Sequence, residues 1–195
     1  GFLGDWILVN GNPDFILPAA TRAYRLRLLN GSNSRIYKLA WQDGSPLTVI
    51  GTDGGLLEGP VQRDYVMLGP GERLELWVDF SRYSVGSETA LVSLPFDGGM
   101  LGGGRRGRGM MGSGVSLPNG AGFPIFKVRV NRREEAPHSL PKRLSTIKRY
   151  RAAEAVNADQ PKRFYLEMRH MNWTINGRIF SMDQVANEEK VRMNS

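Results

Sequence analysis

The sequence contains no cysteine and only two histidines among its 195 residues. Without cysteine the chain cannot form a disulfide, a thiolate nucleophile, an iron–sulfur site or a blue-copper centre, which needs a thiolate ligand. His138 and His170 are too few to build a three-histidine zinc or copper site from this chain alone. No run of eighteen apolar residues occurs either, so we expect no transmembrane helix.

Acidic residues are fewer than basic ones, 19 against 26, which gives a formal charge of +7. Up to about residue 95 the two signs roughly match, and the basic excess lies in the middle and later parts of the chain. Such an excess favours an anionic partner. The length allows one domain plus an additional segment. Because the chain begins Gly1-Phe2-Leu3, without a methionine, we expect an internal piece of a longer protein.

Short apolar stretches separated by turn residues are typical of an all-β sandwich or barrel. The clearest alternation is in 24–28 and 73–80, where every second residue is apolar. The sequence predicts about eight strands before residue 131, near 5–10, 24–28, 36–41, 47–50, 64–68, 73–80, 90–94 and 125–130. Asp43-Gly44 predicts a hairpin and Gly69-Pro70-Gly71 a tight turn, because glycine tolerates positive φ.

A glycine-rich stretch at 97–114 also contains methionine and arginine, and we expect a surface loop there that is mobile unless ligated. Its thioethers, Met100, Met110 and Met111, either fold back on apolar surface or hold Cu(I), which prefers soft ligands. Its arginines, Arg105, Arg106 and Arg108, form a solvated loop, an RNA-binding tract or a steering site for an anionic substrate. The spacing Gly102-x-Gly104-x-x-Gly107 lacks the strand and helix of a dinucleotide site and is interpreted as coincidence.

After residue 130 the pattern changes to charged residues and prolines, which predicts a linker over 131–160 with a helical turn or two near 149–155. A new strand pattern follows at 163–168 and 173–175, where Asn176-Gly177 predicts a hairpin turn. We expect domain 1–130, linker 131–160 and an incomplete second domain, 161–195, whose few strands cannot close a sheet.

Four ordered blocks within residues 1–81 resemble one family, the bacterial multicopper oxidases that include laccases and bilirubin oxidase. The blocks are GFLGDWILVNG at 1–11, YRLRLLNGSN at 24–33, IGTDGGLL at 50–57, and PGER at 70–73 with VDFS at 78–81. They are similar to the middle cupredoxin domain of that family. Trp173-Thr174-Ile175-Asn176-Gly177-Arg178 is similar to the first hairpin of its third domain.

The resemblance implies a copper-free, cupredoxin-like Greek-key β-sandwich, a linker and the first hairpin of a second cupredoxin domain. It further implies a laccase-like enzyme that oxidises phenols, pigments or metal ions by single electrons and reduces O2 to water. The family's copper ligands are His-x-His pairs, a cysteine flanked by histidines, and an axial methionine. Not one of these positions can be carried over, so copper is expected in the full-length enzyme and an isolated chain is expected to be inactive.

The same resemblance implies partners and a location. We expect contacts with cupredoxin domains one and three of the same polypeptide, a small-molecule or metal-ion substrate, no nucleic acid, and a periplasmic or secreted protein. A second hypothesis is a copper-free β-sandwich that binds an anionic polymer through its basic loop and linker. The two hypotheses differ in whether binding falls steeply with salt.

Overall fold

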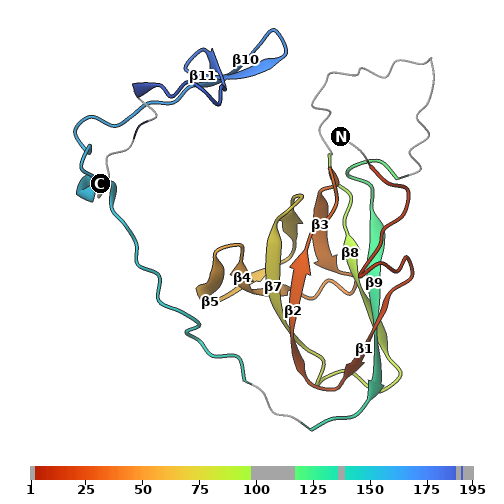
Figure 1. Ribbon diagram of the computed structural model, residues 1–195. Helices are drawn as coiled ribbons and strands as arrows, with labels where there is room; N and C mark the ends of the chain where they lie inside the picture. Colours follow the sequence, from red (N-terminus) through yellow and green to blue (C-terminus); the bar gives the residue numbers. More distant parts are fainter. Residues whose placement is uncertain (1–2, 98–116, 136–138, 188–189, 191–195) are drawn as a thin grey trace, which may run out of the picture. The chain divides into compact units, whose positions relative to one another are not determined.

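The computed structural model describes residues 3–97, 117–135, 139–187 and 190. Within the first part of the chain the strands are β1 (Ile16–Ala20), β2 (Ala23–Leu29), β3 (Tyr37–Trp41), β4 (Leu47–Thr52), β5 (Gly55–Arg63), β6 (Val66–Leu68), β7 (Arg73–Asp79), β8 (Glu88–Ser93) and β9 (Phe123–Arg132). They build the expected all-β sandwich, which is confirmed (Figure 1).

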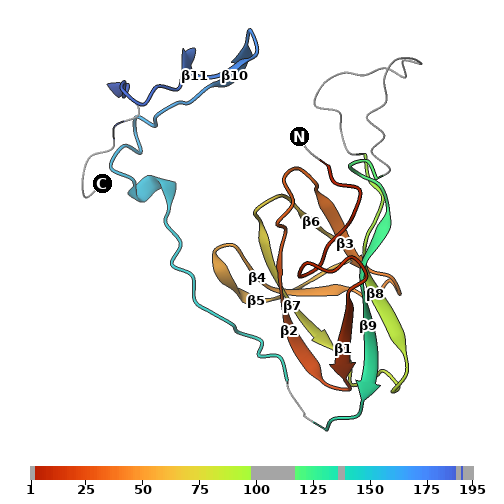
Figure 2. The same cartoon turned by 45° about the vertical axis from the view of Figure 1, so that its right-hand side comes forward.

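Two sheets form the layers of the sandwich. One has the order β1-β9-β8-β3-β6 and the other the order β2-β7-β4-β5. Strand β1 runs parallel to β9. After β1 the chain passes to the other sheet through the short turn that leads into β2. Because β1 and β2 are edge strands of different sheets, they flank one open side of the sandwich, as Figures 1 and 2 both show.

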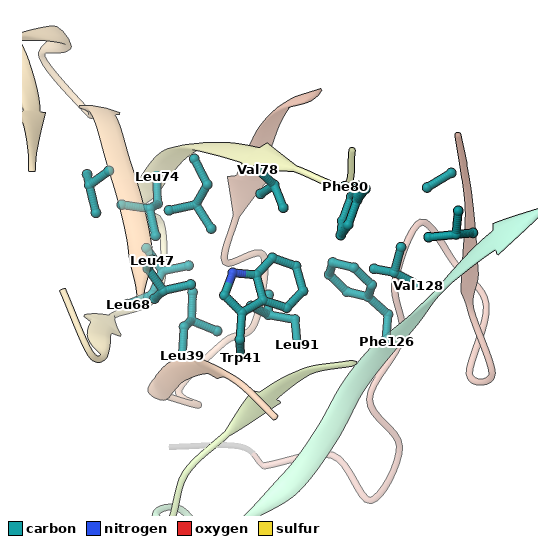
Figure 3. Packing of buried hydrophobic residues seen from close by; sticks show 14 residues of the cluster. Leu39, Trp41, Leu47, Leu68, Leu74, Val78, Phe80, Leu91, Phe126 and Val128 are labelled. Atoms are coloured by element: carbon teal, nitrogen blue, oxygen red, sulfur yellow. The ribbon is translucent and has the colours of Figure 1, made fainter. Parts of the chain in front are cut away.

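The core lies between the sheets and follows from the alternation in β7. Leu74, Leu76 and Val78 point inward and are buried, while their neighbours along the strand are more exposed. Figure 3 shows Trp41 in the middle of the cluster, with Phe80 and Phe126 on one side of it. The Trp41 and Phe80 rings meet edge to face, with centroids 6.2 Å apart, a favoured aromatic geometry.

Three local expectations were wrong. The stretch 5–10 makes only one bridge, Val9 with Asn12, and is not a strand. Strands β1 and β5 were not predicted. They contain Pro18 and the pair Gly59-Pro60, and both strands are edges, where proline is tolerated. Asp43-Gly44 forms a turn but no hairpin, since β3 and β4 belong to different sheets.

Other turns match the sequence. Gly71 takes φ +81° in the turn between β6 and β7, and the Glu72 amide donates to the Gly69 carbonyl at 3.1 Å. Asn176 and Gly177 both have positive φ, 51° and 75°, and join β11 to β12 as a hairpin. These two turns confirm predictions that rested on glycine and asparagine tolerating left-handed backbone.

The chain divides into two compact units, Gly1–Ile147 and Lys148–Ser195. In the first unit, the strap, residues 142–145, lies along β5. The Leu144 amide donates to the Glu58 carbonyl at 2.9 Å, and the Ser145 hydroxyl contacts the Leu56 and Leu57 carbonyls at 3.1 and 2.9 Å. The expected domain boundaries at 130 and 160 stay a prediction.

In its described residues the second unit contains one 3-10 turn, η1 (Ala152–Glu154), and a small sheet. The sheet has strands β10 (Leu166–Arg169), β11 (Asn172–Ile175) and β12 (Arg178–Ile179) in that order, all antiparallel. Large apolar side chains are exposed on and next to this sheet, including Leu166 at 71%, Trp173 at 65% and Phe180, which follows β12, at 80%.

Candidate interaction groove

A groove of about 570 Å³ opens between β1 and β2 on the open side of the sandwich. We call it the edge groove. Its walls come from the segment 4–10, from β1 and β2, and from β9, and its floor reaches core residues of β3, β6 and β8. The apolar side chains along it include Trp6, Ile7, Leu8, Phe15, Leu17, Leu26, Leu28, Leu39, Leu68, Leu91, Ile125 and Phe126. Its volume and apolar lining are typical of binding clefts.

Strand β2 presents a different chemistry on each face. Leu26 and Leu28 point into the sandwich, yet they are only partly buried because the edge groove runs beside them. Arg25 and Arg27 point to the outer face and are exposed. All seven residues of β2 pair with β7, and within the part of the chain that the structure describes no strand pairs with β2 on its other side.

The two arginines of β2 share one carboxylate. Arg25 makes a close ion pair with Glu75 of β7, with its Nε 2.6 Å from Oε2. The Arg27 Nε lies farther from the same carboxylate, at 3.7 Å from Oε1, and its side chain is 72% exposed. The outer face of β2 therefore has a basic excess, and Arg27 has guanidinium N–H groups available to another acceptor.

Arg35 is a charged residue in the lining of the edge groove. It is buried, at 3% exposure, and its guanidinium donates to the carbonyls of Gly4 (2.8 Å), Leu117 (2.7 Å) and Pro118 (3.2 Å). The ion pairs of the described residues include none to Arg35. The guanidinium also lies over the Phe123 ring, 5.7 Å from its centroid. Because its carbonyl partners come from two segments, Arg35 joins the segment before residue 10 to the segment that leads into β9.

Asn30, at the end of β2, organises the neighbouring turns. Its Nδ2 donates to the carbonyls of Arg35 (2.7 Å) and Leu68 (3.0 Å), and its Oδ1 accepts from the Ser32 amide (2.9 Å). The side chain is buried at 3% exposure. Asn30-Gly31-Ser32 matches the acceptor sequence for N-glycosylation. In the folded chain, however, the Asn30 nitrogen that would carry a sugar is buried and hydrogen-bonded, so Asn30 has a structural role.

Two carboxylates near turns serve the fold. The Arg73 side chain donates to Asp53 at 2.9 Å, and this bond lowers the pKa of Asp53. Burial raises the pKa of Asp43, but hydrogen bonds from Ser45 and Tyr83 outweigh it and leave that pKa below 3.8. Burial and the bond to Asp43 raise the pKa of Tyr83 to about 12. Asp53 lies in the turn between β4 and β5, and it also accepts a hydrogen bond from the Arg73 amide at 2.9 Å.

The candidate site residues predicted from the sequence lie outside the described residues. These are the possible Cu(I) ligands Met100, Met110 and Met111 and the possible substrate-steering residues Arg105, Arg106 and Arg108. His138 is also outside them, and His170 lies in the turn between β10 and β11. Sequence reasoning missed the edge groove, since its walls come from segments far apart in the chain. The one available signal was the alternation of leucine and arginine in β2.

The resemblance implies copper in the full-length protein, and the described residues can be compared with the ligands that copper sites need. Among the described residues no group of three or more histidine, cysteine, aspartate or glutamate side chains could hold a metal ion. The chain also has no cysteine to provide the thiolate of a blue-copper centre. The described residues therefore do not fit a type 1 or trinuclear copper site. No helix in the described part is long and apolar enough to cross a membrane.

Comparison with curated proteins finds cell division proteins. The chain is 50% identical over 82 residues to cell division protein FtsP of Edwardsiella tarda, and 49% identical over 81 residues to FtsP of Escherichia coli K12. Each match covers 42% of this chain and 17% of the relative, so the chain spans less than a fifth of these proteins. No family model matches the chain.

The expectation that this chain belongs to a laccase-like oxidase, and with it the assignment as an enzyme, is wrong. Its relatives at 42–50% identity are named as cell division proteins rather than as oxidoreductases. The physical reason for the error is that the described parts of these blocks build strands and turns of the sandwich, such as β2 and the turn at Gly71, rather than a metal site. Their likeness to the oxidases therefore reports the fold, and a fold does not by itself imply a function.

Comparison with solved structures finds the expected family. McoA multicopper oxidase from Aquifex aeolicus has a TM-score of 0.72 at 33% identity, covering 91% of this chain and 35% of McoA. Its 2F4 variant reaches 0.74 at 34% identity with the same coverage. A laccase from Pediococcus acidilactici has a TM-score of 0.67 at 28% identity, covering 95% of this chain and 34% of the laccase. The resemblance recognised in the sequence is thereby confirmed: this chain is a cupredoxin-like β-sandwich segment of the kind found in bacterial multicopper oxidases.

Proposed function

We propose that this chain is a non-catalytic, cupredoxin-like segment of a cell division protein similar to FtsP, and that its sandwich serves as an interaction domain. The observation that carries the proposal is the 49–50% identity to FtsP over about 80 residues. The structural neighbours have the same fold but lower identity, up to 34%. Function follows from the site rather than the fold, and the site that the described residues form is an apolar groove beside a basic edge strand.

The chemistry of the described residues supports binding rather than catalysis. The lining of the edge groove is mainly leucine, isoleucine, valine and aromatic side chains, and its charged residues, Arg27 and Arg35, cannot act as a base at neutral pH. Tyr83, with a pKa raised to about 12, stays protonated at neutral pH and has a structural role. These groups can hold and orient a partner.

We also propose that the second unit contacts further cupredoxin domains of the same polypeptide. Its sheet exposes aliphatic and aromatic side chains such as Leu166 and Trp173. A three-stranded sheet with an uncovered apolar surface requires packing against other strands for independent stability. We further propose an exported location, periplasmic or extracellular, which the likeness to FtsP and to multicopper oxidases supports. Fractionation of cells carrying the full-length protein tests that location.

A chimera tests the division function. In Escherichia coli FtsP, the segment that matches this chain is replaced by the corresponding residues of this chain, and the product is expressed in a strain that lacks FtsP. We expect cell length and division frequency to equal those obtained with FtsP itself. Production and export of the chimera are measured by immunoblot, so that loss of the protein is not scored as loss of function.

The matched control is a second chimera with the corresponding segment of Aquifex aeolicus McoA, which has the same fold at 33% identity to this chain. We expect this chimera to fail, because it supplies the fold without the surface of the present chain. The proposal is overturned if the chimera with the present chain is exported normally but leaves division defective. Equal rescue by the McoA segment would also overturn it, since the sandwich would then act only as a spacer.

A further inference from the structure

In the part of the chain that the structure describes, strand β2 combines an unpaired edge, an apolar groove on its inner face and a basic outer face. We propose that β2 accepts an extended segment of another protein as an added strand. The apolar residues of that segment enter the edge groove, and its alternating acidic residues face Arg25 and Arg27. This inference rests on the proposed function, because it names the kind of partner that the interaction domain takes.

The backbone of β2 provides the first element of recognition. All seven of its residues pair with β7 on one side. An edge strand presents a row of N–H and C=O groups on its other side, and these pair with an incoming strand in β-augmentation. Because β2 is the outermost strand of its sheet, an added strand would extend the order β2-β7-β4-β5 by one.

The edge groove provides the second element. Side chains two residues apart on a strand lie on the same face, about 7 Å apart. An added strand would therefore place every second side chain beside Leu26 and Leu28, which are only partly buried in the free chain. The floor of the groove includes Leu39, Leu91 and Phe126, so these side chains would contact the core of the sandwich. Burial of apolar surface there stabilises the complex.

The arginines provide selectivity. Residues of the added strand that do not enter the groove lie on the outer face, next to Arg25 and Arg27. Among the described residues these two arginines share one acidic partner, Glu75, and the Arg27 Nε lies 3.7 Å from its Oε1. Acidic residues at those positions gain ion pairs, while basic residues are repelled. Charged residues on an edge strand also suppress unselective strand pairing.

The same charges argue against two other occupants. A second copy of this chain pairing through β2 would bring Arg25 and Arg27 of both copies together on one face, which is destabilising. A small amphipathic molecule fills the groove but leaves the backbone groups of β2 unpaired. The combination of unpaired edge, groove and basic face fits an alternating apolar and acidic strand.

The test uses the 195-residue chain and synthetic peptides. One peptide alternates valine and glutamate over the length of β2, a second alternates valine and lysine, and a third is the Val/Glu peptide with methylated backbone nitrogens. Binding is measured by calorimetry, and amide exchange locates it. We expect the Val/Glu peptide to bind and to slow exchange in β2, the Val/Lys peptide to bind at least about tenfold more weakly, and the methylated peptide not to bind.

Substitutions at exposed arginines distinguish an effect of charge on peptide binding from an effect on folding. Arg25→Gln with Arg27→Gln should weaken binding of the Val/Glu peptide about tenfold and reduce its preference over the Val/Lys peptide. The control, Arg63→Gln with Arg129→Gln, removes the same charge elsewhere in the unit and should leave the affinity unchanged. Arg63 and Arg129 lie on β5 and β9.

Four results would overturn the proposal. They are no binding of the Val/Glu peptide, equal binding of the Val/Lys or methylated peptide, protection on binding that leaves β2 unchanged, and dimerisation of the free chain through β2 in sedimentation. The outcome is independent of the division assay. If the chimera fails in cells while the Val/Glu peptide binds, the proposed division function is refuted and the proposed strand site is supported. If the chimera works in cells while the peptide does not bind, only the proposed strand site is refuted.

Discussion

Replacement of Asn30 tests whether its hydrogen bonds hold the turns around the edge groove. In Asn30→Ala, three buried or partly buried hydrogen bonds are lost, those to the Arg35 and Leu68 carbonyls and from the Ser32 amide. Each such bond contributes about 1 kcal/mol net, so the free energy of unfolding should fall by about 3 kcal/mol. For a unit of this size the Tm should fall by roughly 6–12 °C. The assay is thermal and urea unfolding of the full chain.

Asn30→Asp sharpens the test. The introduced carboxyl places an oxygen where Nδ2 now faces two carbonyls, so the ionised form is repelled and the pKa of the introduced carboxyl is raised in the folded state. A raised folded pKa gives stability that is present below the unfolded value of about 4 and lost as the pH rises above it. The variant should therefore be closer to the parent in Tm at pH about 3 than at pH about 7.

Asn33→Ala is the matched control. Asn33 is exposed and lies three residues along the same loop, and we expect its replacement to change the free energy of unfolding by less than about 0.5 kcal/mol. The reasoning is refuted if Asn30→Ala costs less than about 1 kcal/mol. It is also refuted if Asn30→Asp shows no pH trend relative to the parent.

Three further predictions concern other parts of the chain. Because the pKa of Tyr83 is raised to about 12 by burial and by Asp43, the parent should lose stability as the pH rises above 10, and Tyr83→Phe should flatten that part of a Tm profile. In Gly59→Ala the new Cβ would lie 2.8 Å from the Lys142 carbonyl oxygen, so the strap should shift away from β5. The Leu144 amide should then exchange at least about tenfold faster, as measured by mass spectrometry, while the Tm stays nearly unchanged. The amides of β10, β11 and β12 should exchange faster than those of β7, since no larger sheet covers them within the second unit; equal protection would contradict this.

Sequence patterns predicted the strands whose two faces differ in chemistry. In β2 and β7 leucine alternates with charged residues, and this alternation persists because one face is buried and the other is not. This alternation did not predict two of the edge strands, β1 and β5. The proline in β1 and the Gly59-Pro60 pair in β5 are tolerated there because one side of an edge strand needs no partner, and no local pattern distinguishes such a strand from a turn.

The candidate site could be predicted less well than the fold. Arg35 lies in a polar stretch that gives no sign of burial, and its three carbonyl partners come from residues 31 to 83 positions away. The edge groove likewise depends on long-range packing. The methionine and arginine residues of the glycine-rich stretch were prominent in composition, and their predicted roles stay predictions.

The parallel pairing of β1 and β9 determines how the sandwich responds to tension along its own chain. The chain enters β1 at Ile16, opposite Lys127, and leaves β9 beyond Arg132, opposite Ala20. A force that pulls the two ends of this pair apart acts along the strands, so it loads the backbone bonds between them together as a shear. Before that load arrives from the downstream side, the strap must peel from β5, one contact after another. We therefore expect the unit to extend in two stages under force, first at low force as the strap detaches and then at higher force against the bonds between β1 and β9.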